Sequence, residues 1–376
     1  MLTLIYDFNF SFMQIKEITN YLEDIAPLQY AESFDNVGLL VGNYSDEVTG
    51  VLVTLDTLEE TVDEAIAKNC NLIVSFHPII FTGLKKINGN SYVERVVLKA
   101  IKNNIAIYAT HTALDNSKNG VSAKMAAVLH LKNTKILLPK KGIVKKLTTY
   151  VPKEYKEKLK QSLFKAGAGS LGNYSNCSFV IPGTSTFRGN ENATPFLGNK
   201  EKNYANEEIE LTVYFERKYE LKIVKALKTN HPYEEVSYDV ITTDNEYQNI
   251  GMGVIGELDE ELSEHAFLEI LKTKMKIACI RHSCLLNKKI KKVAVLGGSG
   301  SFAISNAIKA NADVYVSADF KYHDFFTAEK KILLADIGHY ESEQFTKNLL
   351  VDYLTKKFTN FAIILSEKNT NPIYYS

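Results

Sequence analysis

The chain has 376 residues, of which 45% are hydrophobic and 23% are charged, so it is long enough for two or three domains and is not of disordered composition. Its 44 Lys and Arg residues balance its 44 Asp and Glu residues, whereas nucleic-acid-binding proteins usually carry a basic excess. No run of 18 or more apolar residues is present, so no membrane-spanning helix is expected.

The first twelve residues are apolar and aromatic, but they contain Asp7 and lack a basic flank. They therefore do not resemble a signal peptide, and the expected compartment is the cytoplasm. Met13 opens a clear amphipathic helix pattern. We consider Met13 an alternative to Met1 as the start of translation.

Residues 13 to about 132 alternate between helix and strand patterns, which indicates an α/β layered fold. The strand patterns are short, apolar and rich in β-branched residues, as in buried parallel strands. Helices are expected over residues 15–25, 58–68, 92–103 and 122–130, and strands over 39–41, 50–55, 72–76 and 105–110.

A different pattern occupies residues 145–245. It has a strand of period two at 208–215, helices near 153–166 and 221–229, and a glycine-rich stretch between them, which predicts a small α+β domain with one solvated sheet face. The α/β alternation then resumes. We therefore predict one discontinuous α/β domain, formed by residues 13–140 and 246–376, with an inserted domain at 145–245.

Four of the apolar strand patterns end in His, Asp or Glu, two of them early and two late in the chain. Ligands of open parallel sheets bind at the carboxyl ends of strands, and mixed imidazole and carboxylate ligands without cysteine suit a divalent metal. Any one of these residues alone is more often a helix cap or a buried core residue. Together they predict a metal site at one sheet edge, reached by both halves of the chain: His77, His111 with Asp115, Asp319 with His323, and His339 with Glu343.

A glycine-rich segment, Gly297-Gly298-Ser299-Gly300-Ser301, follows the strand pattern at 293–296. A tight strand-to-helix turn is the first interpretation, and a phosphate-binding turn is the alternative. The segment has neither the G-x-G-x-x-G spacing nor a Walker lysine.

The chain resembles the Nif-three-like proteins, known as GTP cyclohydrolase type 2 homologs, from about residue 13 to 357. Its middle part is similar to the trimeric PII and CutA proteins through residues 174–179 and 231–235. The segments that carry the main resemblance are residues 31–42 (AESFDNVGLLVG), 76–81 (FHPIIF), 111–115 (HTALD), 318–324 (ADFKYHD) and 338–343 (GHYESE).

The resemblance implies a split α/β domain, a PII/CutA-like insert and two divalent metal ions per subunit, with Zn, Mn and Fe left open. His77 and Asp115 would bind one ion, His339 would bind the other, and Glu343 would bridge both. Phe76 stands where the family often has a ligating histidine.

Because Phe76 cannot bind a metal ion, either His111, His323 or water completes the second site, or only one ion binds tightly. The resemblance also implies a toroidal homohexamer with the metal sites facing its interior.

Two functions follow from this reading. The first is a metal-dependent hydrolase in which metal-bound hydroxide attacks a nucleotide-like or phosphoester substrate while His111 or His323 moves protons. The second is a non-catalytic regulatory or scaffold ring whose inserted domain senses a ligand or binds a partner. Neither a membrane nor a nucleic acid is expected as a partner.

Overall fold

The computed structural model describes residues 13–170 and 172–376, and the chain forms two compact units. Unit 1 contains the described residues up to Pro139 and from Gln248 onward, and unit 2 is Lys140–Tyr247. The alternative between Met1 and Met13 as the first residue concerns a segment outside the described residues. Within the described part, no helix is long and apolar enough to cross a membrane.

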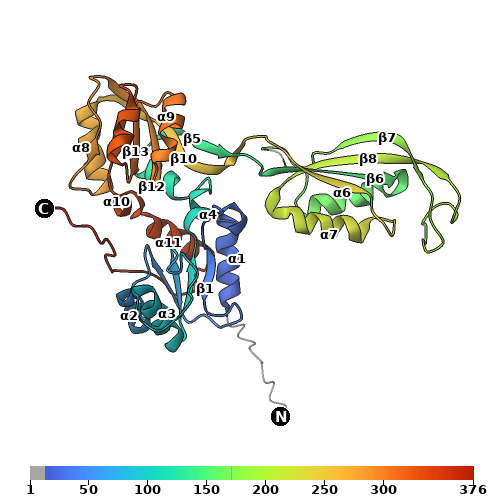
Figure 1. Cartoon of the computed structure of the whole chain (residues 1–376), viewed down its shortest axis with the longest axis horizontal. Helices are drawn as coiled ribbons and strands as arrows, with labels where there is room; N and C mark the ends of the chain where they lie inside the picture. Colours follow the sequence, from blue (N-terminus) through green and yellow to red (C-terminus); the bar gives the residue numbers. More distant parts are fainter. Residues whose placement is uncertain (1–12, 171) are drawn as a thin grey trace, which may run out of the picture. The chain divides into compact units, whose positions relative to one another are not determined.

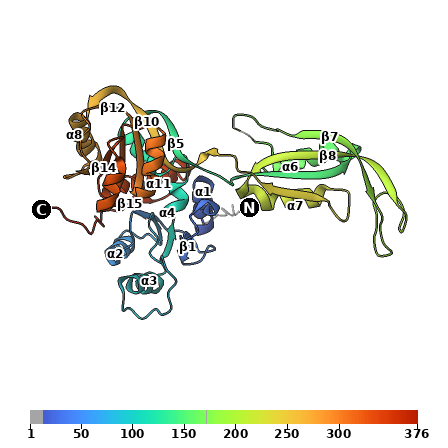
Figure 2. The ribbon, with the colours of Figure 1, turned by 45° about the horizontal axis from the view of Figure 1, so that its top comes forward.

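The first sheet of unit 1 has helices on both faces. Alternate strand residues face opposite sides, so that Val51 and Val53 pack with α1 (Ile15–Ile25) and α11 (Thr346–Lys357), whereas Leu52 packs with α2 (Glu59–Ala67) and α3 (Tyr92–Lys102). In both views α1 and the α2–α3 pair lie on opposite sides of the sheet (Figures 1 and 2). In spatial order, the strands are β1 (Gly38–Val41), β4 (Ala106–Ala109), β3 (Leu72–Ser75), β2 (Val51–Thr54) and β15 (Ile363–Leu365).

The second sheet of unit 1 is also covered on both faces. Helices α5 (Val121–Val128) and α8 (Glu264–Met275) belong to the core on one face, and α9 (Ile304–Lys309) belongs to the core on the other. Three of its strands, β12 (Lys289–Ser299), β13 (Val314–Ala318) and β14 (Leu333–Asp336), follow one another along the chain and run parallel. In spatial order, the strands are β11 (Arg281–His282), β14 (Leu333–Asp336), β13 (Val314–Ala318), β12 (Lys289–Ser299), β10 (Tyr247–Ser263) and β5 (Lys132–Lys140).

The prediction that both halves of the chain contribute to the same sheet edge is wrong. The early strands β2, β3 and β4 lie in the first sheet, and the late strands β12, β13 and β14 lie in the second. Consecutive parallel strands pair within their own half because short connections favour neighbours. What meets instead are the segments after the strands, including the short helices α4 (His111–Asp115) and α10 (His339–Glu343).

Unit 2 is an antiparallel sheet with two helices on one face. Leu147 and Val213 of the sheet share a buried cluster with Leu163 of α6 (Lys156–Lys165) and Leu227 of α7 (Glu220–Asn230), and Figure 1 shows both helices beside the sheet. The chain order strand–helix–strand–strand–helix–strand is that of the ferredoxin-like fold. In spatial order, the strands are β7 (Phe179–Phe187), β8 (Tyr204–Glu216), β6 (Val144–Pro152) and β9 (Tyr238–Thr242).

Candidate metal centre

Residues from both sheets of unit 1 form one cluster of possible metal ligands. His77 follows β3, whereas His339 and Glu343 are the first and last residues of α10. One ligand atom from each of the three lies within 4.8 Å of the others. The four-residue spacing places His339 and Glu343 on the same face of α10.

The Glu343 carboxylate lies between the two imidazoles. Its Oε2 atom is 3.1 Å from Nε2 of His77 and 3.3 Å from Nε2 of His339. Glu343 is 3% exposed, and Oε2 has no hydrogen-bond partner of acceptable geometry. Oε2 therefore pairs by charge with both imidazoles without an ideal hydrogen bond to either, and a cation that replaced the imidazole protons would have all three groups around it.

The charges of the three groups shift one another's pKa values. Burial alone would lower the pKa of His77 and of His339, but the carboxylates around them outweigh burial and raise these values to about 10 and about 11. Burial would likewise raise the pKa of Glu343, but the two imidazoles bring it to about 2. Without metal, protons on the imidazoles therefore hold the positive charge of the cluster.

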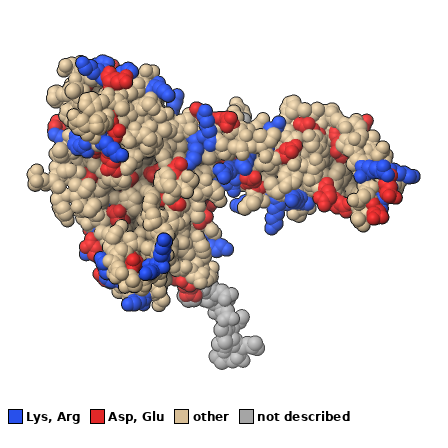
Figure 3. All heavy atoms as spheres, in the orientation of Figure 1, with Lys and Arg blue, Asp and Glu red and all other residues tan. Residues whose placement is uncertain are grey.

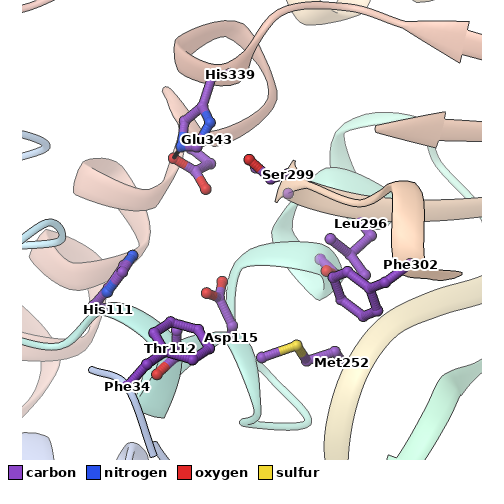
Figure 4. A pocket seen from close by; sticks show the side chains of 13 residues that line it. Phe34, His111, Thr112, Asp115, Met252, Leu296, Ser299, Phe302, His339 and Glu343 are labelled. Atoms are coloured by element: carbon purple, nitrogen blue, oxygen red, sulfur yellow. Dashed lines mark ion pairs between the residues drawn. The ribbon is translucent and has the colours of Figure 1, made fainter. Parts of the chain in front are cut away.

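Asp115 faces the same cavity from the end of α4. In Figure 4 its carboxylate points from below toward Glu343. Burial and the negative charge of Glu343 raise the pKa of Asp115 well above its usual value. Two neighbouring carboxylates repel each other, and a cation between them would remove that repulsion. Asp115 is not a member of the three-residue cluster, so the structure brings it to the cavity but not into that tight group.

Each of three histidines has an aspartate on its Nδ1 atom, at 2.7 Å in every case. Such carboxylate–imidazole pairs orient metal-binding histidines and leave Nε2 available to the ion. This role of Asp35 and Asp56 was not predicted from the sequence, although Asp35 lies in the matched segment 31–42 and Asp56 directly follows the strand pattern 50–55. The pairs are His77 with Asp56, His339 with Asp319 and His111 with Asp35.

The two proposed proton carriers differ in their surroundings. His111 lines the cavity, and its ring centroid is 5.4 Å from that of His77. Its backbone φ is 26°, a strained value of the kind that gathers at functional sites. His323 is exposed, its ring contacts Tyr322 and Phe326, and it is not among the cavity-lining residues.

Asp319 and His323 do not lie on one helix. Asp319 has a left-handed backbone, and His323 lies in the following 3₁₀ segment Tyr322–Ala328. Asp319 instead accepts hydrogen bonds from Ser299 and from His339.

Phe76 is fully buried, and its ring lies 4.9 Å from that of His77 and 5.6 Å from that of His111. It therefore reaches the edge of the centre without offering a ligand atom.

The glycine-rich segment is explained by its contact with Glu343. A Cβ atom at Gly298, where φ is +71°, would lie 2.4 Å from Oε1 of Glu343. The Gly298 N–H donates to Ser342 Oγ at 2.8 Å, and the Gly300 N–H donates to the carbonyl of Ala318 at 3.3 Å. These donors are occupied within the protein, which favours the tight-turn interpretation over a phosphate-binding turn.

The cavity in front of the carboxylates has a volume of about 280 Å³. Its metal-ligand side is polar, and its opposite side is apolar and aromatic (Figure 4). Among the residues that the structure describes, no Lys or Arg lines it. The lining residues are Phe34, His111, Thr112, Asp115, Ser122, Met252, Leu296, Gly297, Gly298, Ser299, Phe302, His339 and Glu343.

Comparison with known proteins shows a close relationship along the whole chain. The sequence profile of the family described as Duf34/NIF3 (NGG1p interacting factor 3) matches residues 13–372. A Bacillus subtilis protein named "GTP cyclohydrolase 1 type 2 homolog" is 35% identical over 370 residues, covering 96% of this chain and 98% of that protein. A Staphylococcus epidermidis protein of the same name is 36% identical over 368 residues, covering 96% of this chain and 100% of that protein.

Solved structures agree with this relationship. A Bacillus cereus protein related to NIF3 superposes with a TM-score of 0.81 at 36% identity, covering 97% of this chain and 100% of that one. The Staphylococcus aureus protein SA1388 superposes with a TM-score of 0.77 at 32% identity, covering 97% and 99% of the two chains.

Proposed function

The chain belongs to the Duf34/NIF3 family, and we propose that it is a metal-dependent hydrolase with two divalent ions per subunit. His77 and Asp115 would hold one ion, His339 the other, and Glu343 would bridge the two. The observation that carries this proposal is the convergence of three possible ligand atoms, with the buried Glu343 Oε2 lying between the Nε2 atoms of His77 and His339. Zn, Mn and Fe all suit such a set of ligands.

The two ions would not be held equally. Phe76 supplies no ligand atom, so the ion at His339 would have only His339 and Glu343 from the protein. We therefore expect the ion at His77 and Asp115 to bind more tightly. A titration with Zn²⁺ followed by metal analysis would show one tight and one weaker equivalent.

When bound, divalent ions in such a centre lower the pKa of water and polarise the bond to be broken. The residues of the chain supply the proton transfers. His111 lines the cavity, and Asp35 holds its Nδ1 atom, which leaves Nε2 to take up or deliver a proton. His323 is the weaker candidate because it lies outside the cavity lining.

The cavity favours a nucleotide-like substrate whose base, and not its phosphate groups, enters the cavity. Phe34 and Phe302 offer aromatic faces on the side opposite the ligands, and aromatic rings stack on flat heterocycles. Within the described part of the chain the lining holds no Lys or Arg, so a triphosphate would find neither of these side chains there. A small phosphoester held directly by the ions is the other substrate that the centre would accept.

Activity assays with the purified protein loaded with Mn, Zn or Fe test this function. Turnover of GTP and simpler purine or phosphoester substrates should be lost in Asp115→Ala and Glu343→Ala. Glu207→Ala, an exposed position on β8, serves as the control. Unchanged turnover in both cavity variants would exclude a hydrolase centred on these residues.

A second function is supported by a separate cavity in unit 2. We propose as the alternative a non-catalytic regulatory or scaffold ring, with unit 2 as a PII/CutA-like module. Its ferredoxin-like sheet carries a cavity of about 470 Å³, lined by aromatic residues and by acidic residues such as the buried Glu208. Such a cavity suits a small ligand with a flat or cationic group.

The two functions give different results when unit 2 is removed. The regulatory function requires that a ligand or partner is lost on deletion while the metal content is retained. It loses its basis if the intact protein binds no ligand through this cavity and captures no partner. The toroidal homohexamer, also a proposal, predicts a mass of about six times 42.3 kDa in sedimentation experiments.

A further inference from the structure

The C-terminal tail, defined as residues 366–376, starts from a fixed point on the first sheet. It follows β15, which pairs with β2. The Ser366 hydroxyl donates to Glu64 Oε2 at 2.6 Å, and the Glu367 N–H donates to Glu64 Oε1 at 2.9 Å. Ser366 and Glu64 are both buried. The tail therefore leaves the sheet that carries His77 in a defined direction.

Four residues further on, the tail reaches the metal centre from outside. The Thr370 hydroxyl donates to Asp56 Oδ2 at 2.5 Å, while Asp56 Oδ1 is 2.7 Å from Nδ1 of His77. Thr370 is 6% exposed. The two oxygens of Asp56 are thus held from two sides, one by the imidazole and one by the tail.

The next tail residue contacts the helix that carries the other ligands. Asn371 Nδ2 donates to Glu341 Oε1 at 2.9 Å. Glu341 lies in α10 between His339 and Glu343, and it is 6% exposed. One short segment therefore connects the supports of ligands that come from opposite halves of the sequence.

The other two histidines show that the Thr370 contact is part of a repeated arrangement. Asp319, which holds His339, accepts a hydrogen bond from Ser299, and Asp35, which holds His111, accepts one from Thr112. In each case the aspartate contacts the imidazole Nδ1 and also accepts a hydrogen bond from a hydroxyl group. Along the chain, the hydroxyl lies 314 residues from the aspartate at His77, compared with 77 at His111 and 20 at His339.

We propose that the C-terminal tail is a positioning strap for the metal centre. Thr370 acts through Asp56 on His77, and Asn371 acts through Glu341 on α10. The Asp56 side chain is 29% exposed, so without Thr370 its free oxygen would turn toward water and the imidazole would lose its fixed orientation. Outer partners of metal-binding histidines typically change metal affinity about 10–100-fold. This inference rests on the proposed metal centre.

The test compares Thr370→Val, which keeps the shape but loses the hydroxyl, with Thr370→Ser, which keeps the hydroxyl. Zn²⁺ dissociation constants are measured on the full chain by competition with a chelator. We expect Thr370→Val to weaken Zn²⁺ binding about tenfold and Thr370→Ser to bind like the unmodified protein. Thr242→Val, at an exposed hydroxyl of β9, is the matched control.

Two further measurements separate positioning from general stability. The melting temperature of the metal-free Thr370→Val protein should remain close to that of Thr370→Ser. In a double-mutant cycle, adding Thr370→Val to Asp56→Ala should cause no further loss of affinity, because the hydroxyl acts through the carboxylate.

The possible results are distinct. Tight Zn²⁺ binding by the unmodified protein together with unchanged binding by Thr370→Val would overturn the strap and leave the metal centre standing. Additive losses in the cycle would overturn the route through Asp56. Absence of Zn²⁺ binding by the unmodified protein would overturn the centre and the strap together.

Discussion

At the scale of single residues, the state of the two histidines before metal binding has a measurable consequence. The carboxylates of Asp56, Asp319 and Glu343 raise the pKa of His77 to about 10 and that of His339 to about 11. Both imidazoles are therefore protonated near neutral pH when no metal is bound. An imidazole must be neutral to bind an ion, so these protons have to leave when the metal enters.

We predict that filling both sites near pH 7 releases at least about two protons, one from each histidine, together with any proton that Asp115 holds because of its raised pKa. Isothermal titration calorimetry with Zn²⁺ in buffers of different ionisation enthalpy measures this number directly. Because protons compete with the metal up to a pH of about 10, affinity should rise with pH through the neutral range. His265→Gln, at an exposed position of α8, should leave the proton count unchanged. Binding without proton release would contradict the protonated starting state.

The second residue-scale prediction concerns proton transfer. His111→Gln should lower turnover about 10²–10⁴-fold, the usual contribution of a general acid or base, while the metal content stays the same. His323→Gln is the informative comparison, because His323 is exposed and outside the cavity lining. Kinetics together with metal analysis of both variants decide between the two residues. A large loss in His323→Gln alone would reverse the assignment.

At the scale of elements, the approach of β12 to α10 leaves no room for a side chain at Gly298. A Cβ atom there would lie 2.4 Å from Glu343 Oε1, and the φ of +71° is unfavourable for other residues. We predict that Gly298→Ala displaces Glu343 and weakens Zn²⁺ binding. The backbone strain alone should cost about 1–3 kcal/mol of unfolding free energy.

Gly183→Ala is the matched control for this variant. Gly183 lies in β7, and a Cβ atom there would meet nothing within 4 Å. Chelator competition and chemical denaturation should show no comparable change. Equal effects of the two substitutions would mean that contact with Glu343 is not the reason for the glycine.

The elements themselves were largely predictable from the sequence, because their periodicity is local. Helix α1, for example, buries Ile15, Ile18 and Leu22 at helical spacing, and the expected range 15–25 is the observed one. The division of the strands between two sheets was not predictable, because buried parallel strands have the same apolar sequence pattern in either sheet.

The residues that orient the metal ligands could not be predicted from the sequence for a related reason. Asp56 after a strand has the sequence appearance of a helix cap, and only the fold shows its side chain at His77. Thr370 lies in a segment without periodicity, far from its partner in sequence. Ligand types and spacing are visible in a sequence, whereas the groups that orient the ligands depend on tertiary contacts.

At the scale of the whole molecule, the charge distribution agrees with the neutral composition. On the face shown in Figure 3, Lys and Arg side chains are interspersed with Asp and Glu on both units. A face prepared for nucleic acid would show a continuous basic area. No such continuous area is visible on this face.

The division into two units leads to the last prediction. All of the proposed ligands and their supports belong to unit 1. The strands that lead to and from unit 2 lie side by side, since a Cβ atom at Gly251 would be 2.1 Å from the carbonyl oxygen of Leu138. A short Gly/Ser linker in place of residues 141–246 can therefore close the chain without displacing either sheet. We expect this deletion variant to bind Zn²⁺ within about twofold of the full chain, because no ligand is removed.

The same variant carrying Glu343→Ala provides the control, since it should lose the bound metal while keeping its secondary structure. Retained metal binding in the deletion variant would show that unit 2 is not needed to assemble the centre. If turnover were retained as well, unit 2 would have a role separate from the chemistry. Loss of metal from a folded deletion variant would instead show that unit 2 is required for the centre, which the ligand positions in unit 1 do not predict.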